Sequence, residues 1–524
     1  MATTGSSPTS FRVEDLRDPA AFSHPVSQLQ IRETHISWIV LTGMFAYKIK
    51  KPVKFDFIDA STLERRLHHC NEELRLNRRL APDLYLDVVP ITRADGRARI
   101  GGDSGSVIEY AVRMQQFDPE QELSALLQRQ DVSPHDIRML GELLARFHLR
   151  TSAAQSDNER PNTEHMYAAV AANLDQLHEH ARQIEQPADL QRLTDWTRDK
   201  ARALESTFQY REQCGYIREC HGDLHCGNIV RWQGRLIPFD CIDFSPELRW
   251  IDVISDIAFL AMDLVSRSRA DLAAMLLSSY LEITADYDGM ELLPFYAVYR
   301  ALVRAKVDAL TAAQSPARAA EFRDRLQRRI RTAMHWTRLP QAALILMHGP
   351  SGSGKSWLSE HLIGALPAVR IRSDLERKRL AGLSATSAAA SEPNTGVYAP
   401  AMSHRTYAHL LECAESCLQM GFHTIVDAAF LDRSDRELFQ GLAARLKKTL
   451  VIVSCGADPA TLSARVQARA ERGGDPSDAD QHVLEAQLRH LTPFDSAEQA
   501  AVVTVDTRDS AVVDRVVAEL RART

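Results

Sequence analysis

Residues 349–356 read GPSGSGKS, and residues 221–228 read HGDLHCGN. The first stretch fits the phosphate-binding pattern G-x-x-x-x-G-K-[ST] at every fixed position. The second has the spacing of a catalytic loop in which an aspartate precedes an asparagine by five positions. The two patterns share no residues and lie far apart in the chain. The sequence therefore predicts two nucleotide sites, each built on a fold of its own.

The length and composition of the chain set the outer limits. With 524 residues it is too long for one hydrophobic core, which predicts two or three domains. The net charge of −6 gives no sign of a nucleic-acid or membrane partner. No stretch approaches the roughly 18 consecutive apolar residues that cross a bilayer, and the N-terminus lacks a signal-peptide pattern. The eight scattered cysteines indicate free thiols in a reducing compartment, so we expect a cytoplasmic protein. The oligomeric state is left open.

The pattern of apolar residues divides the chain into a tail and two domains. Residues 1–25 open with small polar residues and predict a flexible tail. Residues 26–337 form an upstream domain with short strands first and mostly helices afterwards, which predicts an α+β fold of two lobes. Residues 338–524 form a downstream domain in which strands and helices alternate, which predicts an α/β fold with a parallel sheet. The loop 382–400 and the stretch GGDPSDAD (473–480) are expected to be mobile.

Local signals place several elements within the upstream domain. ISWIVLTGMFAYKIKK (36–51) predicts two strands joined around Thr42 and Gly43. The stretch 61–80 has a helical apolar pattern, begins with a capping residue at Ser61 and precedes Pro82.

The P-loop pattern lies in the context that supports its function. The apolar strand LILMHG precedes it and a helix follows it. Glycines let the backbone turn several N–H groups toward one phosphate cluster, and the helix N-terminus adds partial positive charge. Lys355 is expected to reach the β- and γ-phosphates, and Ser356 to bind Mg²⁺. A chance match in a Gly/Ser loop is the alternative. The whole stretch is assigned to nucleotide binding: Gly349, Pro350, Ser351, Gly352, Ser353, Gly354, Lys355 and Ser356.

Acidic residues after two further strands complete this site. Asp374 follows a strand at the edge where substrates bind in parallel sheets, so it is a candidate base for an acceptor hydroxyl. Arg377, one helical turn later, is placed to hold an anionic group. Asp374 as an ordinary acid at a helix N-terminus is an equal alternative. Asp427 ends the strand TIVD and has the position of an acid that supports Mg²⁺.

Three arginines at helical spacing, Arg465, Arg469 and Arg472, predict a lid that stabilises the transferred phosphate. A solvated basic helix face is the alternative. Residues 341 to 524 resemble the small P-loop kinases, namely gluconate kinase, the polynucleotide 5′-kinases and the zeta toxins.

HGDLHCGN resembles the catalytic loop of the aminoglycoside phosphotransferases and choline kinase-like enzymes, which are protein-kinase-like in fold. The resemblance implies that Asp223 aligns or deprotonates the substrate hydroxyl and that Asn228 binds Mg²⁺. It also implies a second metal acid after a hairpin. The stretch 229–238 provides the hairpin with its turn at Gln233 and Gly234. Asp240 is then the preferred acid and Asp243 the alternative.

The same resemblance, over residues 28 to 335, implies a phosphate-binding lysine on a strand and a glutamate on the next helix. Lys48 fits the first role, with Lys50 as competitor, and Glu73 fits the second, with Glu72 beside it. Surface charge is the alternative reading of these residues. One departure is that no G-x-G-x-x-G loop precedes Lys48.

Cysteines and histidines around HGDLHCGN leave a zinc site as an alternative, but their crowding lacks the usual spacing of zinc ligands. His221 is expected to pack in the core. The downstream acids Asp252 and Asp256 are expected to anchor the loop. The four crowded residues are Cys220, His221, His225 and Cys226.

The order of the two domains resembles bacterial proteins described as bifunctional aminoglycoside phosphotransferase/ATP-binding proteins. The resemblance implies ATP and Mg²⁺ as cofactors and a small hydroxyl substrate such as a sugar, an amino alcohol or an aminoglycoside-like compound. One alternative is a regulatory or toxin-like protein whose P-loop domain binds ATP as a switch. Another is a polynucleotide 5′-kinase-like downstream domain, for which a short basic track is available at Arg370, Arg372, Arg377, Lys378 and Arg379.

Overall fold

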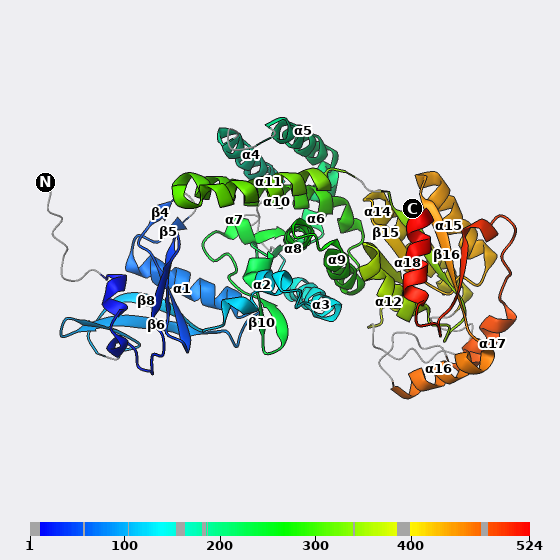
Figure 1. Cartoon of the computed structure of the whole chain (residues 1–524), viewed down its shortest axis with the longest axis horizontal. Coiled ribbons are helices and arrows are strands. Elements are labelled where there is room, and N and C mark those ends of the chain that lie inside the picture. The colour runs from blue at the N-terminus through cyan, green and yellow to red at the C-terminus, as the bar shows by residue number, and fades with distance from the viewer. Residues whose placement is uncertain are drawn as a thin grey trace. The chain divides into compact units, whose positions relative to one another are not determined.

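The computed structural model describes residues 11–523 except 56–57, 103, 154–162, 181–184, 186, 339–340, 385–398 and 473–479. The chain, coloured along its length in Figure 1, splits into two compact units. Unit 1 comprises Met1–Val132, Arg150–His165 and Gln209–Asp256. Unit 2 comprises Ser133–Leu149, Met166–Phe208 and Ile257–Thr524. Most of the loop expected at 382–400 and of GGDPSDAD lies outside the described residues.

Unit 1 is built around a six-stranded antiparallel sheet with the order β1-β2-β3-β8-β6-β7. Its strands are β1 (Gln30–Glu33), β2 (Ser37–Leu41), β3 (Phe45–Lys50), β6 (Tyr85–Ala94), β7 (Arg97–Ile100) and β8 (Ser106–Gln115). The predicted strand pair around Thr42 and Gly43 is β2 and β3, as expected. A separate two-stranded ribbon pairs β4 (Lys54–Phe55) with β5 (Ile58–Asp59).

Helix α1 (Leu63–Asn77) packs against this sheet through Cys70, which shares a core with Ala46 and Val112. The helix is capped by Thr62, whose hydroxyl accepts a hydrogen bond from Arg65 N at 3.3 Å. The expectation that Ser61 caps the helix is therefore wrong. Ser61 instead donates its hydroxyl proton to Asp59 Oδ1 at 2.6 Å. It lies one residue before Thr62, which is too early in the chain to close the first turn of the helix.

Residues 11–25, part of the expected tail, carry two short 3-10 helices, Val13–Leu16 and Pro19–Ala21. Leu16 is fully buried and joins the core beneath the sheet together with Val40 and Ile49. This part of the expected flexible tail is therefore packed against the sheet. Residues 1–10 lie outside the described residues.

The segment around HGDLHCGN consists of short elements. β9 (Ile217–Glu219) pairs with β12 (Trp250–Asp252), and between them β10 (Ile229–Trp232) and β11 (Arg235–Pro238) form a hairpin. Gln233 and Gly234 both have positive φ, 48° and 78°, as the tight turn of a hairpin requires. The predicted hairpin and its turn are thus present. The nearby helices are α2 (Leu123–Gln128), α6 (Glu205–Gln213) and α7 (Pro246–Arg249).

Unit 2 contains the long helices that follow from the helical pattern of the sequence. They are α3 (Pro134–Arg150), α4 (Thr163–Glu179), α5 (Pro187–Ala203), α9 (Ala270–Thr284), α10 (Leu293–Gln314) and α11 (Ala319–Trp336). Helix α8 (Val253–Ser266) begins at the end of unit 1 and continues into unit 2. Within the described part of the chain, no helix combines the length and the apolarity that a bilayer crossing requires.

The rest of unit 2 is an α/β fold with a five-stranded parallel sheet of order β14-β15-β13-β16-β17. The strands are β13 (Ala343–His348), β14 (Ala368–Arg372), β15 (His423–Asp427), β16 (Thr449–Gly456) and β17 (Val502–Asp506). The helices are α12 (Lys355–Ala365), α13 (Ser373–Leu380), α14 (Pro400–Gln419), α15 (Arg433–Leu446), α16 (Pro459–Arg472), α17 (Gln481–Arg489) and α18 (Val512–Arg523). All of β13 is buried at the centre of the sheet. The predicted two-lobed α+β fold and parallel α/β fold are both confirmed.

Candidate functional site

The upstream site begins with a lysine that two carboxylates share. Lys48 Nζ, on β3, lies 2.7 Å from Glu73 Oε1 on α1 and 2.6 Å from Asp240 Oδ1 just after the hairpin. Glu73 is fully buried, whereas the side chain of Asp240 is 45% exposed. The structure thus brings together Lys48, Glu73 and Asp240, which were predicted from separate stretches of the sequence. The carboxylate with solvent access is Asp240.

A second lysine, Lys50, forms an ion pair with the other carboxylate oxygen of Glu73. Lys50 lies on the same face of β3 as Lys48, two residues on, and its Nζ is 2.7 Å from both Glu73 Oε2 and Asp243 Oδ2. Lys50 and Glu73 are fully buried and Asp243 is nearly so. Glu72 points elsewhere and pairs with Arg75 at 2.9 Å. The competitors that the sequence left open, Lys50 and Asp243, therefore form a buried ion pair behind Lys48 and Asp240.

Electrostatics keep this cluster charged. Burial raises the pKa of Glu73, but the ammonium groups of Lys48 and Lys50 outweigh it and hold this pKa at about 2. Burial lowers the pKa of Lys48, and the charges of Asp240 and Glu73 reverse the effect and raise it well above its usual value. The lysine is therefore a permanent cation beside a half-exposed carboxylate.

Asp240 adopts a backbone conformation that needs support. Its φ is +61°, in the left-handed region that few non-glycine residues occupy. Two buried residues of the sheet and α1 hold the loop, because Asp240 N donates to Tyr85 Oη at 3.1 Å and Cys241 N donates to Asn77 Oδ1 at 2.9 Å. No local pattern predicts a role for Tyr85 or Asn77, since both lie far from the hairpin in the chain.

The catalytic-loop residues Asp223 and Asn228 contact each other. The amide nitrogen of Asn228 donates to Asp223 Oδ2 at 2.9 Å and to Asp223 O at 3.0 Å. Because both bonds use the nitrogen, the amide oxygen is the atom that Asn228 offers to a cation. His225 Nε2 lies 3.4 Å from Asp223 Oδ2, and His225 Nδ1 accepts from Gly227 N at 3.0 Å. The loop thus orients one partly exposed carboxylate and one amide oxygen.

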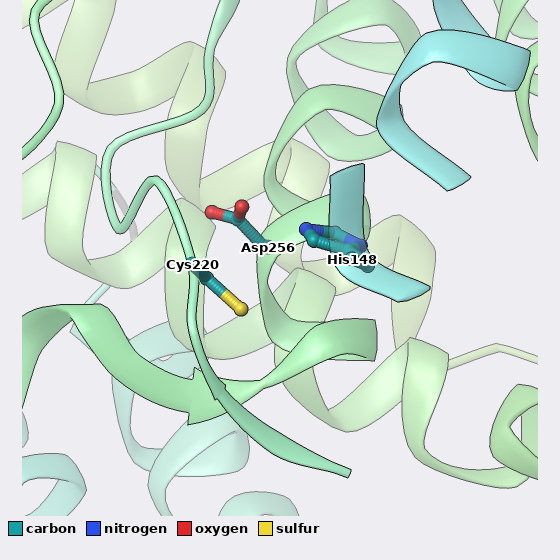
Figure 2. A group of neighbouring side chains, drawn as sticks. All are labelled: His148, Cys220 and Asp256. Carbon is teal, nitrogen blue, oxygen red and sulfur yellow. The ribbon is translucent and has the colours of Figure 1, made fainter. Parts of the chain in front are cut away.

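Asp256, at the start of α8, holds the backbone of the HGDLHCGN loop in place. Its two carboxylate oxygens accept the backbone N–H groups of His221 and Gly222, each at 3.0 Å. Figure 2 shows the Asp256 side chain on its helix near Cys220, which directly follows β9. Asp252 pairs with Arg211 through two bonds of 2.7 and 2.9 Å. These contacts agree with the structural role expected for both aspartates.

The zinc alternative does not fit the contacts of His221 and its neighbours. His221 Nε2 donates to Phe239 O at 2.9 Å, and its Nδ1 accepts from Asp223 N at 3.3 Å, so both ring nitrogens are used. Burial lowers the pKa of His221, which agrees with a neutral ring. Burial also raises the pKa of the Cys220 thiol well above its usual value, which opposes the thiolate that zinc needs. His221 is a packed core residue, as expected.

The P-loop of unit 2 has the backbone that its glycines predict. Gly349, Gly352 and Gly354 have φ values of +136°, +80° and +88°. A Cβ on Gly349 would approach Cys455 O to 2.4 Å, so no other residue fits there without displacing the backbone. Lys355 begins helix α12, and its Nζ donates to Pro350 O at 2.9 Å within the loop.

The acids expected at this P-loop site lie at the same edge of the sheet. Asp427 ends β15 and is in register with Met347 of β13, two residues before the loop. Asp374 lies in the first turn of α13, directly after β14, and its Oδ1 is 4.0 Å from Arg377 NH1. Burial lowers the pKa of Lys355, while the charges of Asp427 and Asp374 oppose this shift. The lysine is therefore within electrostatic reach of both carboxylates.

Helix α16 faces the P-loop with the predicted arginines. Arg465 NH1 donates to Gly352 O at 3.3 Å and to Thr507 Oγ1 at 2.9 Å. Arg469 is close enough for its charge to lower the pKa of Lys355. Gln487 of α17, which sequence reasoning missed, accepts from Ser351 N at 2.7 Å. The side chain of Arg472 lies outside the described residues.

The short basic track considered for a nucleic acid is turned inward. Arg370 is buried and bonds Glu282, while Arg379 pairs with Glu376. Lys378 is buried as well, and Arg372 and Arg377 are mostly covered. These side chains do not form an exposed cationic strip.

Comparison with known proteins gives two family matches along the chain. Residues 60–293 match the phosphotransferase enzyme family, and residues 344–494 match the AAA domain family. Uncharacterized proteins of Mycobacterium tuberculosis and Mycobacterium bovis are 31% identical over 489 residues, which cover 92% of this chain and 94% of theirs.

Two solved structures are similar to parts of the chain. A choline kinase from Cryptosporidium parvum is 11% identical with a TM-score of 0.37, covering 59% of this chain and 88% of its own. A gluconokinase from Sinorhizobium meliloti is 23% identical with a TM-score of 0.26, covering 35% of this chain and 94% of its own. From the match along nearly its whole length, the chain belongs to the family of the mycobacterial proteins, and in this chain the phosphotransferase-family match precedes the AAA-domain match.

Proposed function

We propose that both domains transfer the γ-phosphate of ATP to a hydroxyl group of a small metabolite. The observation that carries the proposal is the position of Glu73, fully buried between Lys48 and Lys50, with Lys48 also paired to the half-exposed Asp240. A cation held on one strand beside an acid after the hairpin is the arrangement that phosphoryl transfer uses to grip nucleotide phosphates.

The upstream residues divide the work as follows. Lys48 binds the nucleotide phosphates, and Glu73 holds Lys48 in place. Asp223 aligns the acceptor hydroxyl and takes up its proton, since its carboxylate is partly exposed and oriented by Asn228. The acceptor class is a sugar, an amino alcohol or an aminoglycoside-like compound.

Mg²⁺ fits the oxygen atoms that the two sites present, because carboxylate, amide and hydroxyl oxygens are its preferred protein ligands. At the upstream site Asn228 and Asp240 would hold it, and Asp243 is already neutralised by Lys50. At the P-loop site Ser356 and Asp427 would hold it. The ion supplies charge neutralisation of the phosphates when it is bound.

At the P-loop site the loop backbone from Gly349 to Ser356 and Lys355 bind the phosphates. Asp374 acts as the base toward the acceptor, and Arg465 and Arg469 stabilise the charge of the transferred group. The contacts of Arg465 with the loop carbonyl of Gly352 support this role.

We further propose that the phosphotransferase domain spans 26–337 and that the P-loop domain spans 338–524. Both family matches fall within these limits. We place the chain in the cytoplasm, since its eight cysteines are free thiols.

The test is an ATP-turnover screen over a metabolite library with the wild type, Asp223→Asn and Lys355→Ala in parallel. Each true acceptor should lose turnover in one variant only, which assigns it to one site. Phosphorylation of short oligonucleotides that Lys355→Ala abolishes would instead favour the polynucleotide-kinase alternative. Loss of acceptor-dependent turnover in neither variant would refute the proposal.

A further inference from the structure

The edge of the parallel sheet in unit 2 is completed by a helix from upstream in the chain. β14 is an edge strand, and α9, which precedes the sheet by many residues, packs along it. Arg370 N of this strand donates to Ser278 Oγ of α9 at 3.0 Å. Both elements belong to the same compact unit. The helix thus supplies a hydrogen-bond acceptor to an edge strand.

A buried ion pair joins the same two elements. Arg370 Nε donates to Glu282 Oε1 at 2.8 Å, and the two side chains are 6% and 15% exposed. Burial lowers the pKa of Arg370, but the charge of Glu282 more than compensates and raises it. The guanidinium therefore stays charged inside the protein. Removing Glu282 would leave that charge without its carboxylate partner.

The other face of the guanidinium contacts the P-loop helix. Arg370 NH1 donates to Ser356 O at 3.2 Å and to Ser359 Oγ at 3.3 Å. Ser356 is the residue whose hydroxyl is assigned to Mg²⁺. An ion pair that served only to join two elements would need neither of these contacts.

Ser359 links Arg370 to Asp427, the acid at the end of β15. Its hydroxyl accepts from Arg370, and its own proton lies within reach of Asp427 Oδ2 at 3.2 Å and Ser356 O at 3.0 Å. Ser359 is fully buried and Asp427 nearly so. One oxygen of Asp427 is thereby fixed from behind, so the orientation of the carboxylate depends on this chain of contacts.

Glu282 also holds the helix that carries the candidate base. Its backbone carbonyl accepts from Arg379 NH2 at 2.9 Å, and Arg379 lies on α13 with Asp374. Its Oε2 is 3.9 Å from Arg372 NH1, at the end of β14. One residue of α9 therefore contacts both elements that flank the expected acceptor position.

We propose that Glu282 is a positioning residue of the P-loop site: it holds Arg370, which through Ser359 orients Asp427, the acid assigned to Mg²⁺. The proposal rests on the function proposed above for the P-loop domain. It makes the metal affinity of that domain depend on a helix that lies within the phosphotransferase match.

The test measures how binding of a fluorescent ATP analogue to the full chain depends on Mg²⁺ concentration. Binding at the P-loop site is the part that Lys355→Ala removes. For Glu282→Gln we expect the Mg²⁺ concentration for half-maximal binding to rise about tenfold, as for other residues that orient a metal ligand. Glu282→Asp should restore part of the affinity. Binding of the analogue in EDTA should stay within about twofold, since the loop itself is unchanged.

Asp271→Asn is the matched control, because Asp271 lies on the same helix and pairs with Arg269 near the surface. Ser359→Ala is the second variant and should show the same Mg²⁺ shift with α9 untouched, so the proposal can be tested even if Glu282→Gln does not fold. Thermal unfolding by circular dichroism checks the fold of each variant.

Three results would overturn the proposal. A folded Glu282→Gln or Ser359→Ala variant with wild-type Mg²⁺ dependence would refute it while leaving the proposed function intact. Equal weakening with Mg²⁺ and with EDTA would show that Glu282 only supports packing. If Lys355→Ala removes no nucleotide binding, the proposed function of the P-loop domain fails, and this inference fails with it.

Discussion

Lys48 Nζ lies 2.6 Å from Asp240 Oδ1, although 192 positions separate the two residues in the chain. The contact joins the antiparallel sheet to the loop after the hairpin. It places a cation for phosphate and an acid for a metal side by side.

Asp223→Asn should abolish acceptor-dependent turnover at the upstream site. A general base contributes about a hundredfold to ten-thousandfold to rate, so kcat should fall by that range while KM changes little. Steady-state kinetics with the acceptor found in the screen would measure it. The control is Asp131→Asn, whose carboxylate pairs with Arg231 on the surface. An Asp223→Asn enzyme with wild-type kcat would remove Asp223 from the mechanism.

Lys48→Met and Lys50→Met should differ in their effects, one mainly on ATP affinity and the other mainly on the free energy of unfolding. Lys50→Met leaves the buried Asp243 without its lysine partner and Glu73 with Lys48 alone, and should cost about 3–5 kcal/mol in the free energy of unfolding. Lys48→Met should weaken ATP binding more and stability less, because Asp240 is half exposed. Urea unfolding and nucleotide titrations of both variants would measure this. The reverse order of effects would contradict the assignment of the two lysines.

Asp374→Asn should distinguish transfer from switching at the P-loop site. If Asp374 is the base, the variant should bind ATP normally and lose turnover by about a hundredfold or more. Lys355→Ala should lose nucleotide binding itself, because Lys355 starts the helix that receives the phosphates. Wild-type turnover in Asp374→Asn together with lost binding in Lys355→Ala would favour a nucleotide switch.

His348, which ends β13 beside the P-loop, should make the stability of unit 2 depend on pH. It is buried, and burial with the charges of Arg436 and Lys355 lowers its pKa to about 4. The unfolded chain takes up this proton below about pH 6.5, so the folded state is favoured above pH 6.5 and loses that advantage as the pH falls toward 4. The full effect is at most about 3 kcal/mol.

His348→Gln should flatten this pH dependence. The measurement compares urea midpoints at pH 7.5 and 5.0 for the wild type and the variant. His409 titrates in the opposite sense, because its bond to Glu376 raises its pKa, but it is present in both proteins. If the urea midpoint changes equally with pH in both proteins, protonation of His348 does not oppose folding, and the prediction is wrong.

Local signals sufficed where the chemistry depends on neighbours in the chain. The glycines of the P-loop and the hairpin turn at Gln233 and Gly234 are properties of short stretches. The assignment of Ser61 as the helix cap failed because the next residue, Thr62, is also a capping residue and only the geometry of the first turn separates the two.

Contacts between residues far apart in the chain could not be predicted from the sequence. Asp240 and Asp243 stand three residues apart on one irregular loop, and what separates them is the burial of Lys50, which no spacing rule contains. Tyr85 and Asn77 support that loop from another part of the fold. The inward turn of the basic track likewise depends on Glu282, far upstream of it.

The packing of α9 along β14 also bears on how the chain can be shortened. An uncovered edge strand offers unpaired backbone groups to any other strand, which makes it a site of aggregation. A fragment that began at residue 338 would lose α9 and expose Arg370 N and its neighbours on β14. The natural cut for an isolated P-loop domain would therefore lie before Ala270, even though the sequence of that domain begins later.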